Sequence, residues 1–117
     1  MIKYLQTRKG DKIAELCDDE RKIADEQDIL DLIGEISADG CSRLIVHEEN
    51  LGADFFDLKT GIAGEMLQKI SNYRFRIAVI GDFEKFKSKS LHDFIRECNR
   101  GESVFFSKDL KLVLDKI

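Results

Sequence analysis

Residues 42–82 read SRLIVHEENLGADFFDLKTGIAGEMLQKISNYRFRIAVIGD and hold two short apolar runs on either side of a long amphipathic segment. The runs are Leu44–Val46 and Ile77–Ile80, and each is continuous rather than alternating. Continuous apolar runs of this length are typical of parallel strands that are buried on both faces. The segment between them predicts a helix that begins near Asp57. We therefore expect a strand, a crossover helix and a second strand parallel to the first.

Upstream of this unit, the pattern predicts a β-hairpin and a helix. Two short runs, Ile2–Thr7 and Lys12–Cys17, flank a turn at residues 9–11, where glycine can supply the positive φ that tight turns need. Apolar residues then recur at helical spacing, with Asp25 as the expected N-cap and Gly40 as the stop.

Downstream of it, residues 90–93 (SLHD) predict a capping box that opens a helix ending at Gly101. Residues 103–106 follow as a strand, and Ser107 is the expected cap of a last short helix. The predicted order is ββαβαβαβα. This order predicts a single α/β domain over residues 1–117, with a mixed, mostly parallel sheet and one antiparallel edge.

Composition bounds the class of protein. The chain has 117 residues, of which 43% are hydrophobic and 36% charged, as expected for one charged globular domain. No apolar run approaches the roughly 20 residues of a membrane span, and the N-terminus lacks the apolar core of a signal peptide. Cys17, Cys41 and Cys98 form no C-x-x-C pair. We expect reduced, mostly buried thiols in a cytoplasmic protein.

Charge is distributed unevenly along the chain. Residues 1–58 carry 7 basic and 15 acidic side chains, whereas residues 59–117 carry 12 basic and 8 acidic ones. One interpretation is two differently solvated faces. The other is two faces of opposite sign that orient a protein partner or a second copy of the chain. The net charge of −4 argues against non-specific binding to nucleic acid.

Polar residues gather where the predicted parallel strands end, which is where α/β sheets usually meet ligands and partners. His47 shares a strand face with Ile45 by alternation, which favours a hydrogen-bonded core histidine. The alternative is an acid/base or metal-binding group formed with Glu48, Glu49 and Asp82. No metal-ligand spacing is present, and we predict no catalytic residue and no cofactor. The candidate site for a partner or ligand consists of His47, Glu48, Phe55, Phe56, Asp57, Lys59, Thr60, Asp82, Ser88 and Lys89.

Gly61 and Gly64 fall inside the predicted helix, where each costs about 1 kcal/mol relative to alanine. The favoured reason is a close approach of the helix backbone to the sheet or to a neighbouring element. The alternative is a helix start that exposes its N–H groups to an anion or a partner. The order Lys59-Thr60-Gly61 does not match a phosphate-binding loop, because there the glycines precede the Lys and Thr.

Aromatic residues mark two loops. We expect one ring of Phe55-Phe56 to be buried and the other to be an exposed anchor for a partner. Residues 83–90 alternate basic and other side chains, which favours a solvated loop with its Phe rings against the core. Binding of single-stranded nucleic acid is the alternative for this loop.

Residues 54–65 (DFFDLKTGIAGE) resemble an uncharacterised bacterial family of domains of unknown function (DUF4180-like). The likeness extends to the segments SNYR (71–74), IGDF (80–83), SKSL (88–91) and DFI (93–95). It covers nearly the whole chain and implies no established activity.

The element order is also similar to that of the STAS domain of anti-sigma-factor antagonists. In that fold, a serine that precedes a glycine at a helix start is phosphorylated by a partner kinase. The nearest counterpart here is residues 58–63, so the resemblance implies Thr60 as a phosphosite. The chain departs from the motif because Thr replaces Ser, Lys59 replaces the preceding Ser, and the loop before it is longer.

Two functional hypotheses remain. The first is a non-enzymatic regulatory or interaction module that binds a protein partner, or a second copy in a homodimer, through residues 51–64. The second is a small-ligand-binding protein or enzyme with a site at the strand ends, where His47 or Glu48 is the acid/base group and Lys59 or Lys89 holds an anion.

Overall fold

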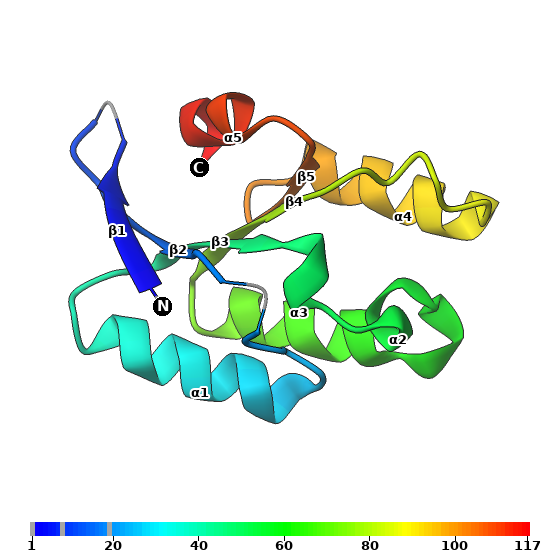
Figure 1. Cartoon of the computed structure of the whole chain (residues 1–117), viewed down its shortest axis with the longest axis horizontal. Coiled ribbons are helices and arrows are strands. Elements are labelled where there is room, and N and C mark those ends of the chain that lie inside the picture. Colours follow the sequence, from blue (N-terminus) through cyan, green and yellow to red (C-terminus); the bar gives the residue numbers. More distant parts are fainter. Residues whose placement is uncertain (1, 8, 19) are drawn as a thin grey trace.

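The computed structural model describes residues 2–7, 9–18 and 20–117, so that Met1, Arg8 and Asp19 lie outside the described residues. A five-stranded sheet with the order β1-β2-β3-β4-β5 forms the centre of the molecule (Figure 1). β1 is antiparallel to β2, and the remaining neighbours are parallel. The strands are β1 (Ile2–Gln6), β2 (Lys12–Leu16), β3 (Arg43–His47), β4 (Arg76–Ile80) and β5 (Val104–Ser107).

Helices cover both faces of this sheet, but unequally. The larger core joins one face of the sheet to α1, α3 and α4. The smaller core lies under α5 alone, whose Val113 and Ile117 contact Ile13, Ile45 and Phe105. In Figure 1, α1 and α3 lie below the sheet and α5 lies above it. The helices are α1 (Glu26–Ser37), α2 (Ala53–Phe56), α3 (Ile62–Asn72), α4 (Lys89–Arg100) and α5 (Leu110–Lys116).

The predicted parallel pair at the centre of the sheet is confirmed. Leu44 lies opposite Ile77, and Val46 lies opposite Val79, with α3 in the connection between the two strands. The mixed, mostly parallel α/β sheet is likewise confirmed. The connection is more elaborate than predicted, because it also contains α2 and the 3-10 turns Glu48–Asn50 and Leu58–Thr60.

The predicted start of the crossover helix is wrong. α3 begins at Ile62, and the residue before it, Gly61, has φ +76°. That left-handed conformation breaks the helix and favours a residue without a Cβ. Leu58 kept the helical spacing although it belongs to a separate 3-10 turn. The close approach predicted for Gly64 is also wrong, because a Cβ there would meet nothing within 4 Å.

Helix caps were predicted with mixed success. Asp25 caps α1 as expected, and its carboxylate accepts from the Asp28 amide at 3.0 Å. The cap of α4 is Ser88 rather than Ser90, and that of α5 is Asp109 rather than Ser107. In both cases the cap is another residue with a short polar side chain, two positions away, and N-cap preference alone does not choose between the two.

The hairpin is confirmed, with Gly10 at φ +88° between β1 and β2. The three cysteines are free thiols, but the expectation that most are buried is wrong. Only Cys41 is buried, since Cys98 is half-buried and Cys17 exposed. Among the described residues, no helix combines the length and the apolar character that a membrane crossing requires.

Candidate functional site

The carboxyl ends of β3 and β4 lie side by side, because His47 is the register partner of Ile80. The chain therefore brings Glu48 next to Gly81 and Asp82, as the sequence predicts. The Glu48 carboxylate accepts from the Asp82 amide at 3.1 Å and forms an ion pair with Lys85. This hydrogen-bonded pair raises the pKa of Lys85.

Gly81 is essential to this contact. A Cβ on Gly81 would lie 2.6 Å from the Glu48 Cβ and 2.8 Å from its Oε1. Only glycine leaves room for the Glu48 side chain, which is 12% exposed. Glu48 therefore joins the ends of two strands, and its carboxylate is already occupied by an amide and an ammonium group.

His47 points away from this contact. Its Nε2 lies 2.8 Å from Glu15 Oε2, on the neighbouring strand β2. The predicted face is right, since His47, Glu15 and Ile45 share the side of the sheet that α5 partly covers. Among the described residues, no hydrogen bond or ion pair joins His47 to Asp82 or Lys89. It lines a separate hollow of about 520 Å³ with Cys17.

Asn50 is a buried polar residue that the sequence analysis missed. Its side-chain amide donates to the carbonyl oxygens of Asp18 at 2.8 Å and Arg21 at 3.0 Å. Its carbonyl oxygen accepts from the His47 amide at 2.8 Å. Asn50 thus ties the β2–α1 connection to the end of β3. The only available signal was an asparagine beside an apolar strand, which sequence alone does not distinguish from a loop residue.

The expectation that one ring of Phe55-Phe56 is exposed is wrong. Phe55 is 3% and Phe56 8% exposed. Phe56 stacks on Phe86 at a centroid distance of 4.8 Å, and Phe55 lies 6.4 Å from Phe106. Phe83 completes the cluster at 6.0 Å from Phe56, so the rings of the 83–90 loop pack against the core as predicted.

The buried rings of Phe55 and Phe56 anchor a loop whose polar side chains are exposed. Thr60 Oγ1 lies 2.7 Å from the Asp54 carbonyl oxygen and 2.9 Å from that of Asp57, and it accepts from the Ile62 amide at 3.2 Å. Asp57 Oδ1 accepts from the Lys59 amide at 3.2 Å. All these contacts are local, and the side chains of Asp54, Asp57, Lys59 and Thr60 are exposed. The Thr60 hydroxyl therefore links the end of α2 to the start of α3, together with main-chain hydrogen bonds such as that from the Thr60 amide to the Asp57 oxygen at 3.1 Å.

Ser88 and Lys89 belong to the start of α4. Ser88 Oγ accepts from the Leu91 amide at 3.2 Å, which is an ordinary N-cap. Lys89 is 91% exposed and pairs with Asp93 at 3.6 Å. No group of three or more His, Cys, Asp or Glu residues within the described ranges could hold a metal ion.

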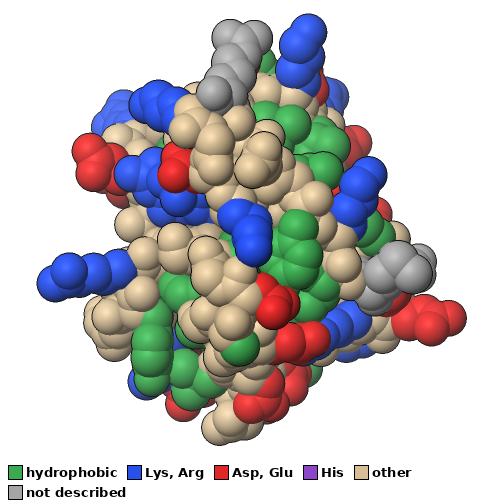
Figure 2. All heavy atoms as spheres, turned by 90° about the vertical axis from the view of Figure 1, so that its left-hand side faces the viewer, with side chains coloured by type: hydrophobic (Ala, Val, Ile, Leu, Met, Phe, Trp, Pro, Cys, Tyr) green, Lys and Arg blue, Asp and Glu red, His purple; other side chains and the backbone are tan. Residues whose placement is uncertain are grey.

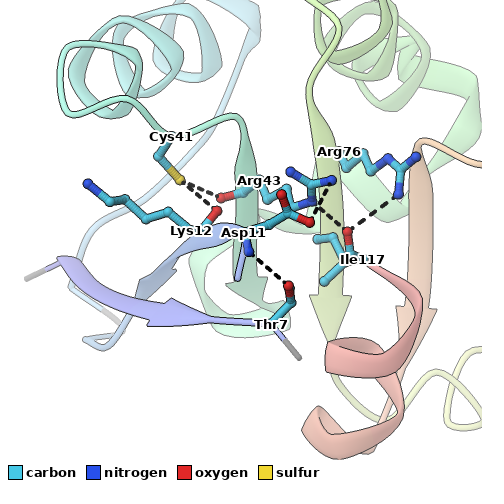
Figure 3. Close-up of polar contacts among 7 residues, drawn as sticks. All are labelled: Thr7, Asp11, Lys12, Cys41, Arg43, Arg76 and Ile117. Atoms are coloured by element: carbon cyan, nitrogen blue, oxygen red, sulfur yellow. Dashed lines mark hydrogen bonds and ion pairs between the residues drawn. The ribbon is translucent and has the colours of Figure 1, made fainter. Parts of the chain in front are cut away.

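The sequence analysis also missed two arginines at the opposite edge of the sheet. Arg43 and Arg76 are the first residues of β3 and β4 and are register partners. Figure 3 shows both side chains directed toward the main-chain oxygen of Ile117 at the end of α5. In the sequence, one arginine directly precedes each of the two apolar runs. Sites in α/β sheets usually lie at the carboxyl ends of the strands, so residues at the amino ends were not expected to form one.

Comparison with known proteins gives one positive result. Residues 8–117 match the model of the family described as "Domain of unknown function (DUF4180)". The chain belongs to this family. The match begins near the hairpin turn and runs through α5. This DUF4180 domain therefore includes the polar residues at the carboxyl ends of β3 and β4 as well as Arg43 and Arg76. No curated protein and no solved structure gave a match.

Proposed function

We propose that this DUF4180 domain is a non-enzymatic regulatory module of the bacterial cytosol, which binds a protein partner through residues 51–64. We further propose that modification of Thr60 controls the binding. The observation that carries the proposal is that one exposed hydroxyl, that of Thr60, contacts the Asp54 and Asp57 carbonyl oxygens and the Ile62 amide, and so joins the end of α2 to the start of α3.

The loop is suited to recognition because its buried and exposed halves are separate. Phe55 and Phe56 anchor it in the aromatic cluster, while Asp54, Lys59 and Thr60 face solvent. A surface that is already ordered loses less conformational entropy on binding than a flexible one. The partner would meet a polar loop rather than the exposed ring that the sequence suggested.

The chemistry of Thr60 supports a switch. A phosphate on Oγ1 removes the proton that the hydroxyl donates toward Asp54 O and Asp57 O, so the loop loses this side-chain hydrogen bond. It also adds about −1.5 to −2 charges next to the carboxylates of Asp54 and Asp57. Both effects would open the loop and repel an acidic partner.

A STAS-like relationship is part of this proposal. The support is a sheet in which a first antiparallel strand is followed by four strands in chain order, with Thr60 and Gly61 directly before α3, the longer helix between β3 and β4. In STAS domains the phosphorylated serine stands at the start of the corresponding helix. Fold likeness alone does not establish function, so the proposal depends on the loop contacts.

The alternative is a small-ligand site at the strand ends. It is favoured by the hollow around His47, where the half-exposed imidazole lies beside Glu15 and the exposed thiol of Cys17. The pairing of Glu48 with Lys85 removes the second expected acid/base group from this site. A ligand in the hollow would shift the NMR signals of the His47 ring, and a fragment library that leaves them unchanged would speak against this alternative.

Site-specific photo-crosslinking in bacterial cells tests the main proposal. A photoreactive amino acid replaces Lys59 in one variant and Asp54 in another, and both positions are exposed with no role in the core. The matched control carries the same amino acid in place of Lys111, an exposed lysine on α5. We expect a discrete crosslinked product, with a partner or a second copy, at positions 54 and 59 and none at 111.

Either of two results would contradict the proposal. One is the absence of any product at positions 54 and 59 while the purified variants remain folded. The other is the same set of products at position 111, which would indicate random collision.

A further inference from the structure

A basic hollow lies at the edge of the sheet opposite to residues 51–64. It measures about 250 Å³ and opens between the hairpin turn, the first residues of β3 and β4, and the end of α5. Its basic wall consists of Lys9, Arg43, Arg76 and Lys116. In Figure 2, basic side chains gather in the upper part of the face, on the side of the hairpin and α5, and acidic ones in the lower part, on the side of α1.

Arg43 and Arg76 converge on one acceptor. Arg43 Nε donates to the Ile117 main-chain oxygen at 2.6 Å, and Arg76 Nη1 reaches the same oxygen at 3.4 Å (Figure 3). Because the two residues are register partners, their side chains leave the same face of the sheet at the same level. The fold therefore holds two guanidinium groups side by side.

The positive charge of the hollow is only partly compensated. Asp11 Oδ2 pairs with Arg43 Nη2 at 3.4 Å, and Asp115 is the other acidic residue of the wall. Within the described ranges, the only partner of the Arg76 guanidinium is the Ile117 oxygen. Four basic and two acidic side chains thus surround the hollow. Neighbouring like charges repel, and an anion bound between them relieves that repulsion.

We propose that this hollow binds a phosphate group, as inorganic phosphate or as a small phosphomonoester, through the remaining N–H donors of Arg43 and Arg76. Guanidinium groups present their donors in a planar fork that matches phosphate oxygens. A phosphate group offers at least three acceptor oxygens, enough for donors from both guanidinium groups, whereas a carboxylate offers two. Leu114 and Ile117 give the hollow an apolar side for the organic part of an ester.

NMR titration of the purified full chain tests this inference. The probes are inorganic phosphate, glycerol phosphate and acetate, added at equal ionic strength because salt screens such contacts. We expect saturable shifts of the Arg43 and Arg76 Nε–H signals with both phosphate compounds and none with acetate. Tighter binding of glycerol phosphate would identify the ester as the source, and equal binding would identify the inorganic ion.

Two variants separate a site from general attraction to a basic surface. Arg76→Gln removes the guanidinium group with the longer contact to the Ile117 oxygen, 3.4 Å. The control Arg100→Gln removes an exposed guanidinium group on α4. We expect Arg76→Gln to weaken phosphate binding at least about tenfold, or about 1.4 kcal/mol, and Arg100→Gln to leave it unchanged. The melting temperature of Arg76→Gln verifies that the variant is folded.

If Arg76→Gln does not fold, Lys9→Ser replaces it, because Lys9 is an exposed member of the wall. The inference is overturned if phosphate causes no saturable shift, if acetate binds equally, or if Arg100→Gln weakens binding as much as the variant of the hollow.

Discussion

Two glycines on this chain have opposite roles at the scale of single residues. Gly81 leaves the space that the Glu48 side chain fills, whereas a Cβ on Gly64 would meet nothing within 4 Å. Gly64 lies inside α3 and is exposed, so it costs helix stability and gains no packing contact in return.

Alanine substitutions at these two glycines should therefore change stability in opposite directions. Gly81→Ala forces the Glu48 side chain to move and should destabilise the fold by about 1–3 kcal/mol. Gly64→Ala should stabilise it by about 1 kcal/mol, since alanine favours the helix. Urea denaturation of both variants measures the difference. A loss of stability in Gly64→Ala would mean that this glycine has a packing role which the structure does not contain.

A second residue-scale prediction concerns pH. The Tyr4 hydroxyl donates to Asp39 Oδ2 at 2.5 Å, and this hydrogen bond raises the pKa of Tyr4 from 10.0 to about 12. The neutral phenol is thus favoured in the folded state. Its contribution to stability is present below pH 10 and is lost as the pH rises from 10 to about 12.

The ultraviolet absorbance of tyrosinate follows this titration, and subtraction of the Tyr4→Phe curve isolates it. In Asp39→Asn the midpoint should move toward the ordinary value of 10.0. An unchanged midpoint in Asp39→Asn would show that the carboxylate is not the cause.

Sequence predicts the positions of polar residues better than their partners. Glu48 and Asp82 were expected at one rim because parallel strands end at the same edge, and they meet there. The partner of His47 was not foreseen, since Glu15 comes from a strand distant in sequence. The burial of both Phe55 and Phe56 was missed because Phe83 and Phe86, which cover Phe56, come from a remote loop.

At the scale of elements, Asn50 links the β2–α1 connection to the end of β3. It connects the residues after β2, those before α1, and the end of β3, and it is 0% exposed. Ile23 reinforces the link through a parallel bridge with Leu51. These contacts hold the segment that precedes residues 51–64 against the β2–α1 connection.

Asn50→Ala should destabilise the fold by at least about 2 kcal/mol, because the backbone groups of His47, Asp18 and Arg21 lose their partner in a buried place. The matched control is Asn72→Ala, since Asn72 is exposed and its side chain accepts from the Gln68 amide at 3.0 Å. Chemical denaturation compares the two variants. Equal stability losses would contradict the assigned role of Asn50.

The strands were easier to predict than the connection between them. Continuous apolar runs set β3 and β4, because a segment buried on both faces tolerates few polar residues. Leu58 matches the helical spacing of α3 by coincidence, and the real path of residues 51–61 depends on Gly61 at φ +76° and on the ring cluster. Contacts between segments that are distant in sequence determine this path, so the local sequence pattern does not predict it.

For the whole molecule, the two proposed sites lie at opposite edges of one sheet. Residues 51–64 follow the carboxyl end of β3, and the arginine pair lies at the amino ends of β3 and β4. The two sites share β3 but no side chain. Variants at one edge should therefore leave binding at the other unchanged, and each proposal can fail without the other.

The yield of the crosslinked complex from position 59 in Thr60 variants tests the regulatory role of the loop most directly. We expect Thr60→Ser, which keeps the hydroxyl and its three contacts, to give the yield of the unmodified chain. Thr60→Glu, which removes the donor and adds a charge beside Asp54 and Asp57, should lose most of the complex. Equal yields from Thr60→Glu and Thr60→Ser, with both variants folded, would contradict the account.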